Sequence, residues 1–119
     1  MERKIHGVFS CHKWGFTIYS ATRSWAKEFG KYGVRVIGVA PGILEATGLR
    51  TLAYEEALAY TRGISVDDLR RGYASTKTTP LGRSGKLTEV ADLVVYLASE
   101  RASYIHGVTY NVAGGKTRG

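Results

Sequence analysis

The spacing of apolar and polar residues along the chain predicts four helices. The first runs from Ser20 to about Lys31, with an apolar stripe on one face, and the glycines Gly30 and Gly33 mark its end. A second, shorter helix is predicted from Leu52 to about Tyr60. Its stripe runs through Leu52, Ala53, Glu56, Ala57 and Tyr60.

Residues of the types that cap helix N-termini predict the other two helices. Ser65 precedes a helix through Tyr73, and two aspartates in the first turn suit the positive end of the helix dipole. Thr88 is expected to cap the last helix. The broad apolar face of that helix consists of Val90, Ala91, Leu93, Val94, Leu97 and Ala98.

Two strands complete the pattern. Val34–Ala40 is β-branched and almost continuously apolar, as a parallel strand buried on both faces would be, and Pro41-Gly42 ends it. A shorter strand runs from Gly107 to about Val112, before Gly114-Gly115. A strand, helix, strand order implies a right-handed parallel crossover. Because two strands leave most of a sheet uncovered, the pattern is that of the end of an α/β domain.

Composition narrows the class of protein. The chain has 119 residues, 44% hydrophobic and 23% charged, which is typical of a globular domain. A single cysteine, Cys11, excludes an internal disulfide, and the three histidines have no metal-ligand spacing, so no metal is predicted. No apolar stretch approaches the roughly 18 residues of a membrane span, and no signal-peptide core is present. We therefore expect a cytoplasmic protein without a membrane partner.

The chain is basic, with 17 Lys and Arg against 10 Asp and Glu and a formal net charge of +7. The basic residues are spread almost evenly, with Arg3-Lys4 and Arg70-Arg71 as the only adjacent pairs. Nucleic-acid modules usually gather such residues on one helix or stripe. The dispersed charge favours steering of an anionic substrate or cofactor, with a nucleic-acid module as the weaker alternative.

Four motifs carry the candidate chemistry. In chain order they are Tyr19-Ser20-Ala21-Thr22, Val39-Ala40-Pro41-Gly42-Ile43 with Thr47 a turn later, Pro80-Leu81-Gly82-Arg83-Ser84-Gly85-Lys86, and Gly107-Val108-Thr109-Tyr110-Asn111-Val112-Ala113-Gly114-Gly115. Together they resemble the C-terminal half of the short-chain dehydrogenase/reductase family. The resemblance covers about residues 19–119 and leaves 1–18 unassigned.

The resemblance implies a Rossmann-like doubly wound parallel sheet, of which this chain would hold an incomplete C-terminal portion. It implies NAD as cofactor, bound by Pro41, Gly42, Ile43 and Thr47, and a sugar-alcohol phosphate as substrate. Tyr19 would be the catalytic proton donor. Helices over about residues 51–76 would form a lid, with Arg50 and Arg62 as candidate phosphate ligands. Members of the family form homo-oligomers.

The sequence departs from the family pattern at the catalytic positions. The family places a lysine four residues after its tyrosine, where it lowers the tyrosine pKa, but Arg23 stands there. The distance from Tyr19 to Pro41 is short of the family's by roughly eight residues, about 12 Å of helix. The catalytic serine and the glycine-rich pyrophosphate turn have no match. We therefore expect a truncated, catalytically impaired dehydrogenase, or alternatively a non-catalytic fragment that self-associates or pairs with an intact homologous subunit.

Overall fold

The structure is a computed structural model that describes residues 15–116, and these form two compact units. The first unit holds the described residues up to Pro41 together with Ala91–Asn111. The second holds Gly42–Val90 and the described residues from Val112 onward. Within 15–116, no helix is long and apolar enough to cross a membrane.

Helix α1 (Gly15–Phe29) opens the first unit, and it begins five residues earlier than the sequence predicts. A short 3-10 helix, η1 (Gly30–Tyr32), follows it. Gly33 then adopts a left-handed conformation (φ 73°), and its N–H donates to the Gly30 carbonyl at 3.0 Å. Glycine suits this position because a side chain would be strained there, so the predicted helix exit is confirmed.

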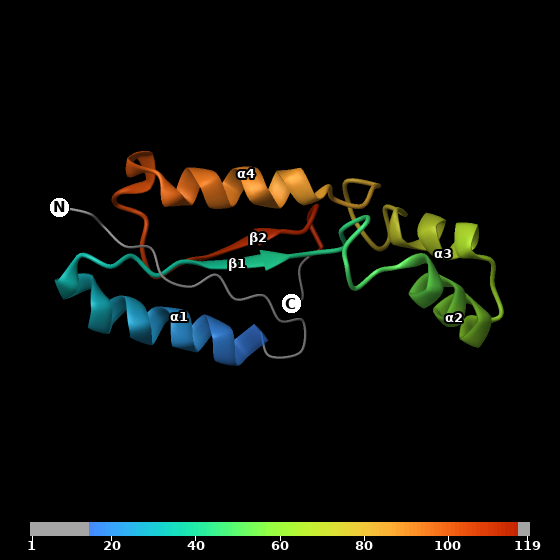
Figure 1. Cartoon of the computed structure of the whole chain (residues 1–119), viewed down its shortest axis with the longest axis horizontal. Helices are drawn as coiled ribbons and strands as arrows, with labels where there is room; N and C mark the ends of the chain where they lie inside the picture. Colours follow the sequence, from blue (N-terminus) through green and yellow to red (C-terminus); the bar gives the residue numbers. More distant parts are fainter. Residues whose placement is uncertain (1–14, 117–119) are drawn as a thin grey trace. The chain divides into compact units, whose positions relative to one another are not determined.

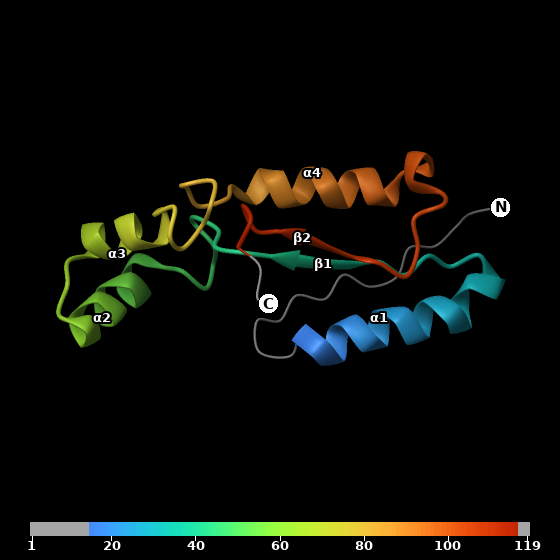
Figure 2. The same ribbon diagram turned by 180° about the vertical axis from the view of Figure 1, so that it is seen from behind.

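The strands β1 (Gly38–Pro41) and β2 (Thr109–Val112) form a parallel pair. The Gly38 N–H donates to the Val108 carbonyl and the Gly42 N–H to the Val112 carbonyl, each at 2.9 Å. The partner numbers rise together, as parallel strands require. Figures 1 and 2 show α1 on one side of this pair and α4 (Leu87–Ala98) on the other.

Strand β1 begins later than predicted and includes Pro41, so the expectation of a strand over Val34–Ala40 is wrong at both ends. The chain already runs beside the β2 segment at Val36, whose carbonyl accepts the Gly107 N–H at 2.8 Å. However, the Val36 N–H donates to a side chain, Nδ1 of His106, at 3.0 Å. This substitution of a ring nitrogen for a backbone carbonyl explains why regular pairing starts only at Gly38.

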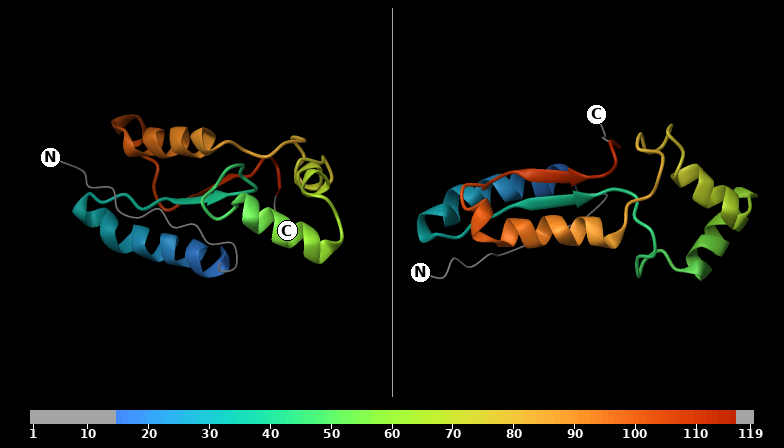
Figure 3. Two further views of the ribbon diagram at one scale, coloured as in Figure 1. Left: turned by 45° about the vertical axis from the view of Figure 1, so that its right-hand side comes forward. Right: turned by 90° about the horizontal axis from the view of Figure 1, so that it is seen from above.

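The second unit contains a pair of consecutive helices, α2 (Leu52–Arg62) and α3 (Val66–Tyr73), shown in Figure 3. Ser65 caps α3 as predicted, because its hydroxyl accepts the Asp68 N–H at 3.0 Å. The stripe predicted for α2 is exposed at every position. The residues of α2 that are buried are Glu55 and Ala59, since α2 turns a different face towards its neighbours.

Helix α4 begins at Leu87, so the prediction that Thr88 caps it is wrong. The N–H of Lys86 donates instead to the Glu89 carboxylate, at 2.8 Å to Oε2. A glutamate three residues into a helix reaches back to the exposed backbone N–H, as in a capping box.

The ring of His106 ties together three segments of the first unit. Its Nδ1 accepts the Val36 N–H, and its Nε2 lies 2.6 Å from the Ala26 carbonyl of α1. Since Nδ1 accepts, Nε2 must carry the proton and donate to Ala26, which fixes the neutral tautomer. The turn before β2 is thereby joined to α1 and to the chain leading into β1.

We expect His106→Ala to lower the free energy of unfolding of the chain by about 1–2 kcal/mol, because it removes two hydrogen bonds and leaves the Val36 N–H without its acceptor. Urea denaturation followed by circular dichroism measures the change. Tyr104→Ala is the control, since Tyr104 lies two residues away and is 101% exposed. Equal losses for both variants would show that the ring does not clamp these segments.

Candidate functional site

Tyr19 lies inside α1, one turn after the helix begins, and not at its start as the sequence predicts. Its side chain is 39% exposed, and its hydroxyl donates to Oδ1 of Asn111 in β2 at 2.9 Å. Arg23, one turn further along the helix, is exposed. The hydroxyl is therefore positioned by β2, and among residues 15–116 it makes no hydrogen bond with a cation.

The chain leaves β1 through a close approach to the end of β2. A Cβ built on Gly42 would lie 2.7 Å from the Cα of Ala113, so no larger residue fits without moving backbone. The next residue, Ile43, accepts the Gly85 N–H on its carbonyl at 2.9 Å. Gly42 and Ile43 are both half-buried, and both are fixed by backbone contacts within the second unit.

Thr47 closes a tight turn at the end of the same loop. Its Oγ1 accepts the Arg50 N–H at 3.0 Å, and its carbonyl accepts the same N–H at 2.9 Å. Because the hydroxyl accepts in the turn, its proton remains able to donate to a ligand. Gly42, Ile43 and Thr47 thus fall in the second unit, whereas Tyr19 and Pro41 fall in the first.

Gly42, Ile43 and Thr47 remain candidates for the nicotinamide side of a cofactor, whereas the glycines after β2 are not available to hold its pyrophosphate. In the loop at 42–47, Gly42, Ile43 and Thr47 are half-buried, and the Thr47 hydroxyl is able to donate a hydrogen bond. The glycines with positive φ after β2 do not form an open cradle, because a Cβ on Gly114 would lie 2.7 Å from Cγ2 of Thr79 and one on Gly115 3.1 Å from Pro80. They pack against the chain itself, so no residue in 15–116 is assigned to the pyrophosphate.

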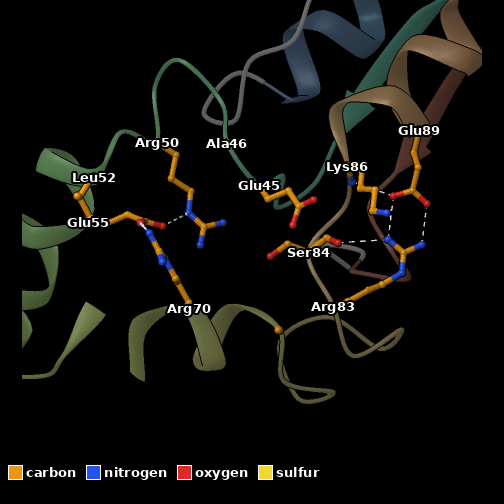
Figure 4. A pocket seen from close by; sticks show the side chains of 11 residues that line it. Glu45, Ala46, Arg50, Leu52, Glu55, Arg70, Arg83, Ser84, Lys86 and Glu89 are labelled. Atoms are coloured by element: carbon orange, nitrogen blue, oxygen red, sulfur yellow. Dashed lines mark hydrogen bonds and ion pairs between the residues drawn. The ribbon is translucent and has the colours of Figure 1, made fainter. Parts of the chain in front are cut away.

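The second unit contains a polar pocket of about 930 Å³, which we call the lid pocket (Figure 4). It draws its walls from the loop before α2, from α2 and α3, and from the turn that leads into α4. Arg50 lines it and Arg62 does not. Its charged lining residues are Glu45, Arg50, Glu55, Arg70, Arg83, Lys86 and Glu89.

Two guanidinium groups share one buried carboxylate on one side of this pocket. Glu55 is 4% exposed; its Oε1 accepts Nε of Arg50 at 2.8 Å, and its Oε2 accepts Nε and Nη2 of Arg70 at 3.0 and 2.6 Å. The hydrogen bonds from Arg70, with a further contribution from Arg50, hold the pKa of Glu55 below its usual value. The carboxylate therefore stays ionised at neutral pH despite its burial.

Arg50 is held on three sides. Besides Glu55, it donates from Nη1 to the Leu44 carbonyl at 3.1 Å, and its guanidinium lies 4.6 Å from the centre of the Tyr73 ring. Such a stacked, doubly bonded guanidinium has little rotational freedom left to lose on binding a ligand. The sequence named Arg50 as a phosphate candidate but gave no sign of this network, whose members lie on separate elements.

Arg83 and Glu89 form a two-pronged ion pair on the other side of the pocket, with distances of 2.8 and 2.6 Å. The hydrogen bonds from Arg83, followed by that from the Lys86 N–H, lower the pKa of Glu89 to about 2. The ammonium group of Lys86 itself has no hydrogen bond or ion pair within residues 15–116.

Apolar residues of α1 and of the chain around β1 line a groove of about 810 Å³ in the first unit. Ile18, Trp25 and Phe29 come from the helix, and Val36 and Ile37 from the chain leading into β1. Trp25 and Phe29 both remain more than a third exposed. An open apolar surface of this kind is common where another protein segment packs.

Comparison with known proteins decides the family. A family model described as enoyl-(acyl carrier protein) reductase matches residues 12–117, which is nearly the whole chain. The chain belongs to the short-chain dehydrogenase/reductase family. The predicted α/β class and Rossmann-like fold are confirmed, with a two-stranded parallel sheet in this part of the domain. The match begins at residue 12, earlier than the residue 19 expected from the motifs.

Individual relatives agree with this assignment. Sorbitol-6-phosphate 2-dehydrogenase from Klebsiella pneumoniae is 70% identical over 100 residues, which cover 84% of this chain and 37% of that protein. The solved sorbitol-6-phosphate 2-dehydrogenase from Erwinia amylovora has a TM-score of 0.70 and 25% identity, over 87% of this chain and 40% of that one. L-Sorbose reductase from Gluconobacter frateurii, solved with NADPH and L-sorbose, has a TM-score of 0.74 and 25% identity, over 87% and 38%. This chain thus spans less than half the length of each.

The low pKa of Glu89 predicts a specific loss of stability in acid. Its folded-state pKa of about 2 lies below its ordinary value of 4.5, so its contribution is present above about pH 4.5 and is lost as the pH falls towards 2. We expect the difference in urea midpoint between the parent chain and Glu89→Gln to be largest at neutral pH and to shrink below pH 4.5.

Glu56→Gln is the matched control, because Glu56 is an exposed glutamate of α2 without an ion pair in the described part of the chain. Its midpoint should follow that of the parent chain at every pH. A Glu89→Gln difference that stays constant between neutral pH and about pH 2 would contradict the assignment.

Proposed function

We propose that this chain carries the nicotinamide-side loop and the substrate lid of a dehydrogenase that interconverts sorbitol 6-phosphate and fructose 6-phosphate. The observation that supports the substrate is the 70% identity to the Klebsiella enzyme across the 100 matched residues. That stretch makes up 84% of this chain, a share large enough to include most of both units. Identity at this level makes a shared lid chemistry the simplest explanation.

The cofactor in this proposal is a nicotinamide dinucleotide, which supplies the hydride acceptor or donor, and NAD is the form we favour. Pro41, Gly42, Ile43 and Thr47 would line its nicotinamide side, with the Thr47 hydroxyl as hydrogen-bond donor. L-Sorbose reductase, a relative of similar fold, was solved with NADPH. Tyr19 is the candidate proton donor, with its hydroxyl held by Asn111.

The proposal also holds that the chain by itself is catalytically impaired. A phenol is a poor base at neutral pH unless a nearby cation favours the phenolate. The contact made by Tyr19 is to the neutral amide of Asn111, and Arg23 stands exposed where the family has its lysine. Moreover, no described residue is assigned to the cofactor pyrophosphate, so the nicotinamide ring would lack its usual anchor.

Two chimeras of the Klebsiella relative separate the substrate proposal from the impairment. The first takes only residues 42–90 from this chain, and we expect its KM for fructose 6-phosphate to stay within about threefold of the parent enzyme. The second takes residues 19–119, and we expect its kcat to fall at least ~100-fold, the usual size of a lost acid–base contribution. Oxidation of NADH reports both rates.

The outcomes are distinguishable. A first chimera that folds but no longer prefers fructose 6-phosphate over unphosphorylated fructose would overturn the substrate proposal. A second chimera with the parent rate would show that Tyr19 and its surroundings suffice for catalysis. The isolated chain, assayed beside them, is expected to give no turnover.

A second candidate function, pairing with a homologous subunit, is favoured by Arg35. Its side chain is 7% exposed, and Nη2 donates to the Ser99 carbonyl at 3.3 Å. Its Nε and Nη1 are buried without a hydrogen-bond partner among residues 15–116. A buried cation without a counter-ion is costly, so an opening of this site that admits a carboxylate from another chain, beside the open apolar groove of the same unit, would be favourable.

Arg35→Met tests this pairing. The chain alone is expected to unfold at an equal or higher urea concentration, because replacing an unpaired buried charge by an apolar residue removes a desolvation cost. Binding to the intact Klebsiella enzyme, measured by sedimentation velocity, is expected to weaken about tenfold or more. Arg23→Met on exposed α1 surface is the control. Unchanged binding of Arg35→Met would remove Arg35 from any interface.

A further inference from the structure

We propose that the lid pocket binds the phosphate group of a phosphorylated polyol, and that Arg50, Arg70 and Lys86 are its cationic ligands. The phosphate assignment is argued from the pocket alone. Only the identity of the polyol rests on the proposed function given above.

The cations that line the lid pocket outnumber its carboxylates by four to three. The two guanidinium groups of Arg50 and Arg70 share the single carboxylate of Glu55, which leaves that cluster with one uncompensated positive charge. The Lys86 ammonium makes no hydrogen bond or ion pair within residues 15–116, although the Glu89 carboxylate attracts it electrostatically. Arg83 adds no net charge, because Glu89 neutralises it with two hydrogen bonds. With Glu45 counted, the four cations and three carboxylates of the lining leave a net charge of +1, which favours an anion such as phosphate.

Both arginines beside Glu55 keep guanidinium nitrogens that make no hydrogen bond within residues 15–116. Arg50 uses Nε and Nη1 for Glu55 and Leu44, and Arg70 uses Nε and Nη2 for Glu55. Nη2 of Arg50 and Nη1 of Arg70 therefore remain as donors. Because the Glu55 carboxylate already fixes both guanidinium groups, they lose little rotational freedom when they donate to a ligand. Fixed guanidinium donors of this kind favour the binding of phosphate.

Figure 4 shows how these groups are arranged. Arg50 and Arg70 approach Glu55 from two sides, Arg83 and Lys86 lie with Glu89 at the other side of the pocket, and in this view Glu45 and Ser84 lie between the two clusters. The Ser84 hydroxyl is a further possible donor within the same walls. The volume of about 930 Å³ leaves room for a six-carbon polyol attached to the phosphate.

The Glu45 carboxylate would repel a phosphate bound in the lid pocket. It is an exposed carboxylate that lines the pocket, and its charge acts on Arg83. Removing the charge of Glu45 is therefore expected to strengthen phosphate binding, whereas removing that of Lys86 or Arg70 weakens it.

The experiment measures binding of inorganic phosphate, fructose 6-phosphate and fructose to the 119-residue chain by amide chemical-shift titration at constant ionic strength. We expect both phosphate-bearing probes to shift resonances of residues 44–55 and 70–89, and fructose to leave them unchanged. Lys86→Gln is expected to weaken phosphate binding about tenfold, and Arg70→Gln by a similar factor. Glu45→Gln is expected to tighten it severalfold.

Each variant has a matched control in the same unit. Lys77→Gln removes an exposed lysine outside the pocket, and Arg71→Gln removes an arginine next to Arg70 that pairs with Asp68 at 2.5 Å. Neither is expected to change phosphate binding more than twofold. Lys86→Gln breaks no hydrogen bond of the side chain, so it remains informative if Arg70→Gln unfolds the unit.

The proposal is wrong if Lys86→Gln and Lys77→Gln weaken binding equally, which would indicate a general charge effect, or if Glu45→Gln has no effect. It is also wrong if phosphate does not bind to the folded chain. These results are independent of the chimera assay. If the first chimera turns over fructose 6-phosphate but the lid pocket does not bind phosphate, the substrate phosphate binds elsewhere. If the pocket binds phosphate but the chimera does not prefer fructose 6-phosphate, the phosphate site stands and the proposed substrate is wrong.

Discussion

The parallel pairing of β1 with β2 is the constraint on which the rest of the structure depends. It joins segments 71 residues apart in the sequence, from Gly38 to Thr109. Its far end requires a glycine at 42, because any side chain there would meet the backbone of Ala113. The chain that connects these paired strands, residues 42–108, includes α2, α3 and α4. In open α/β sheets, ligands bind beyond the carboxyl ends of the strands, and the candidate cofactor loop begins at this point.

Features set by neighbouring residues could be predicted from the sequence. Ser65 caps α3 because its hydroxyl reaches a backbone N–H only three residues away, and Gly33 ends η1 through its own backbone conformation. Thr88 does not cap α4 because the helix already begins at Leu87, and Glu89 accepts the Lys86 N–H at its start. Capping preferences do not show which of two neighbouring residues a helix uses, since each residue type alone is acceptable near a helix N-terminus.

Features set by distant residues could not be predicted. The late start of β1 depends on His106, whose ring takes the Val36 N–H across 70 positions of sequence. The face of α2 that is buried depends on Glu55, because two arginines from other segments compensate its charge. Apolar periodicity assigns a glutamate to solvent, and only the tertiary partners reverse that assignment. The family motifs, by contrast, predicted the fold, because chains that share these motifs also share the tertiary contacts of the fold.

The positive charge of the chain also shows, at the candidate site, how tertiary structure adds what the sequence alone does not reveal. Counted along the sequence, basic residues are dispersed and indicate no particular ligand. In the second unit, however, the pocket walls bring four of them together with three carboxylates. The carboxylates do not simply cancel them: Glu89 neutralises Arg83, while Glu55 orients two guanidinium groups at once. A net charge thus says little about recognition, and the ratio of cations to carboxylates within one set of walls says much more.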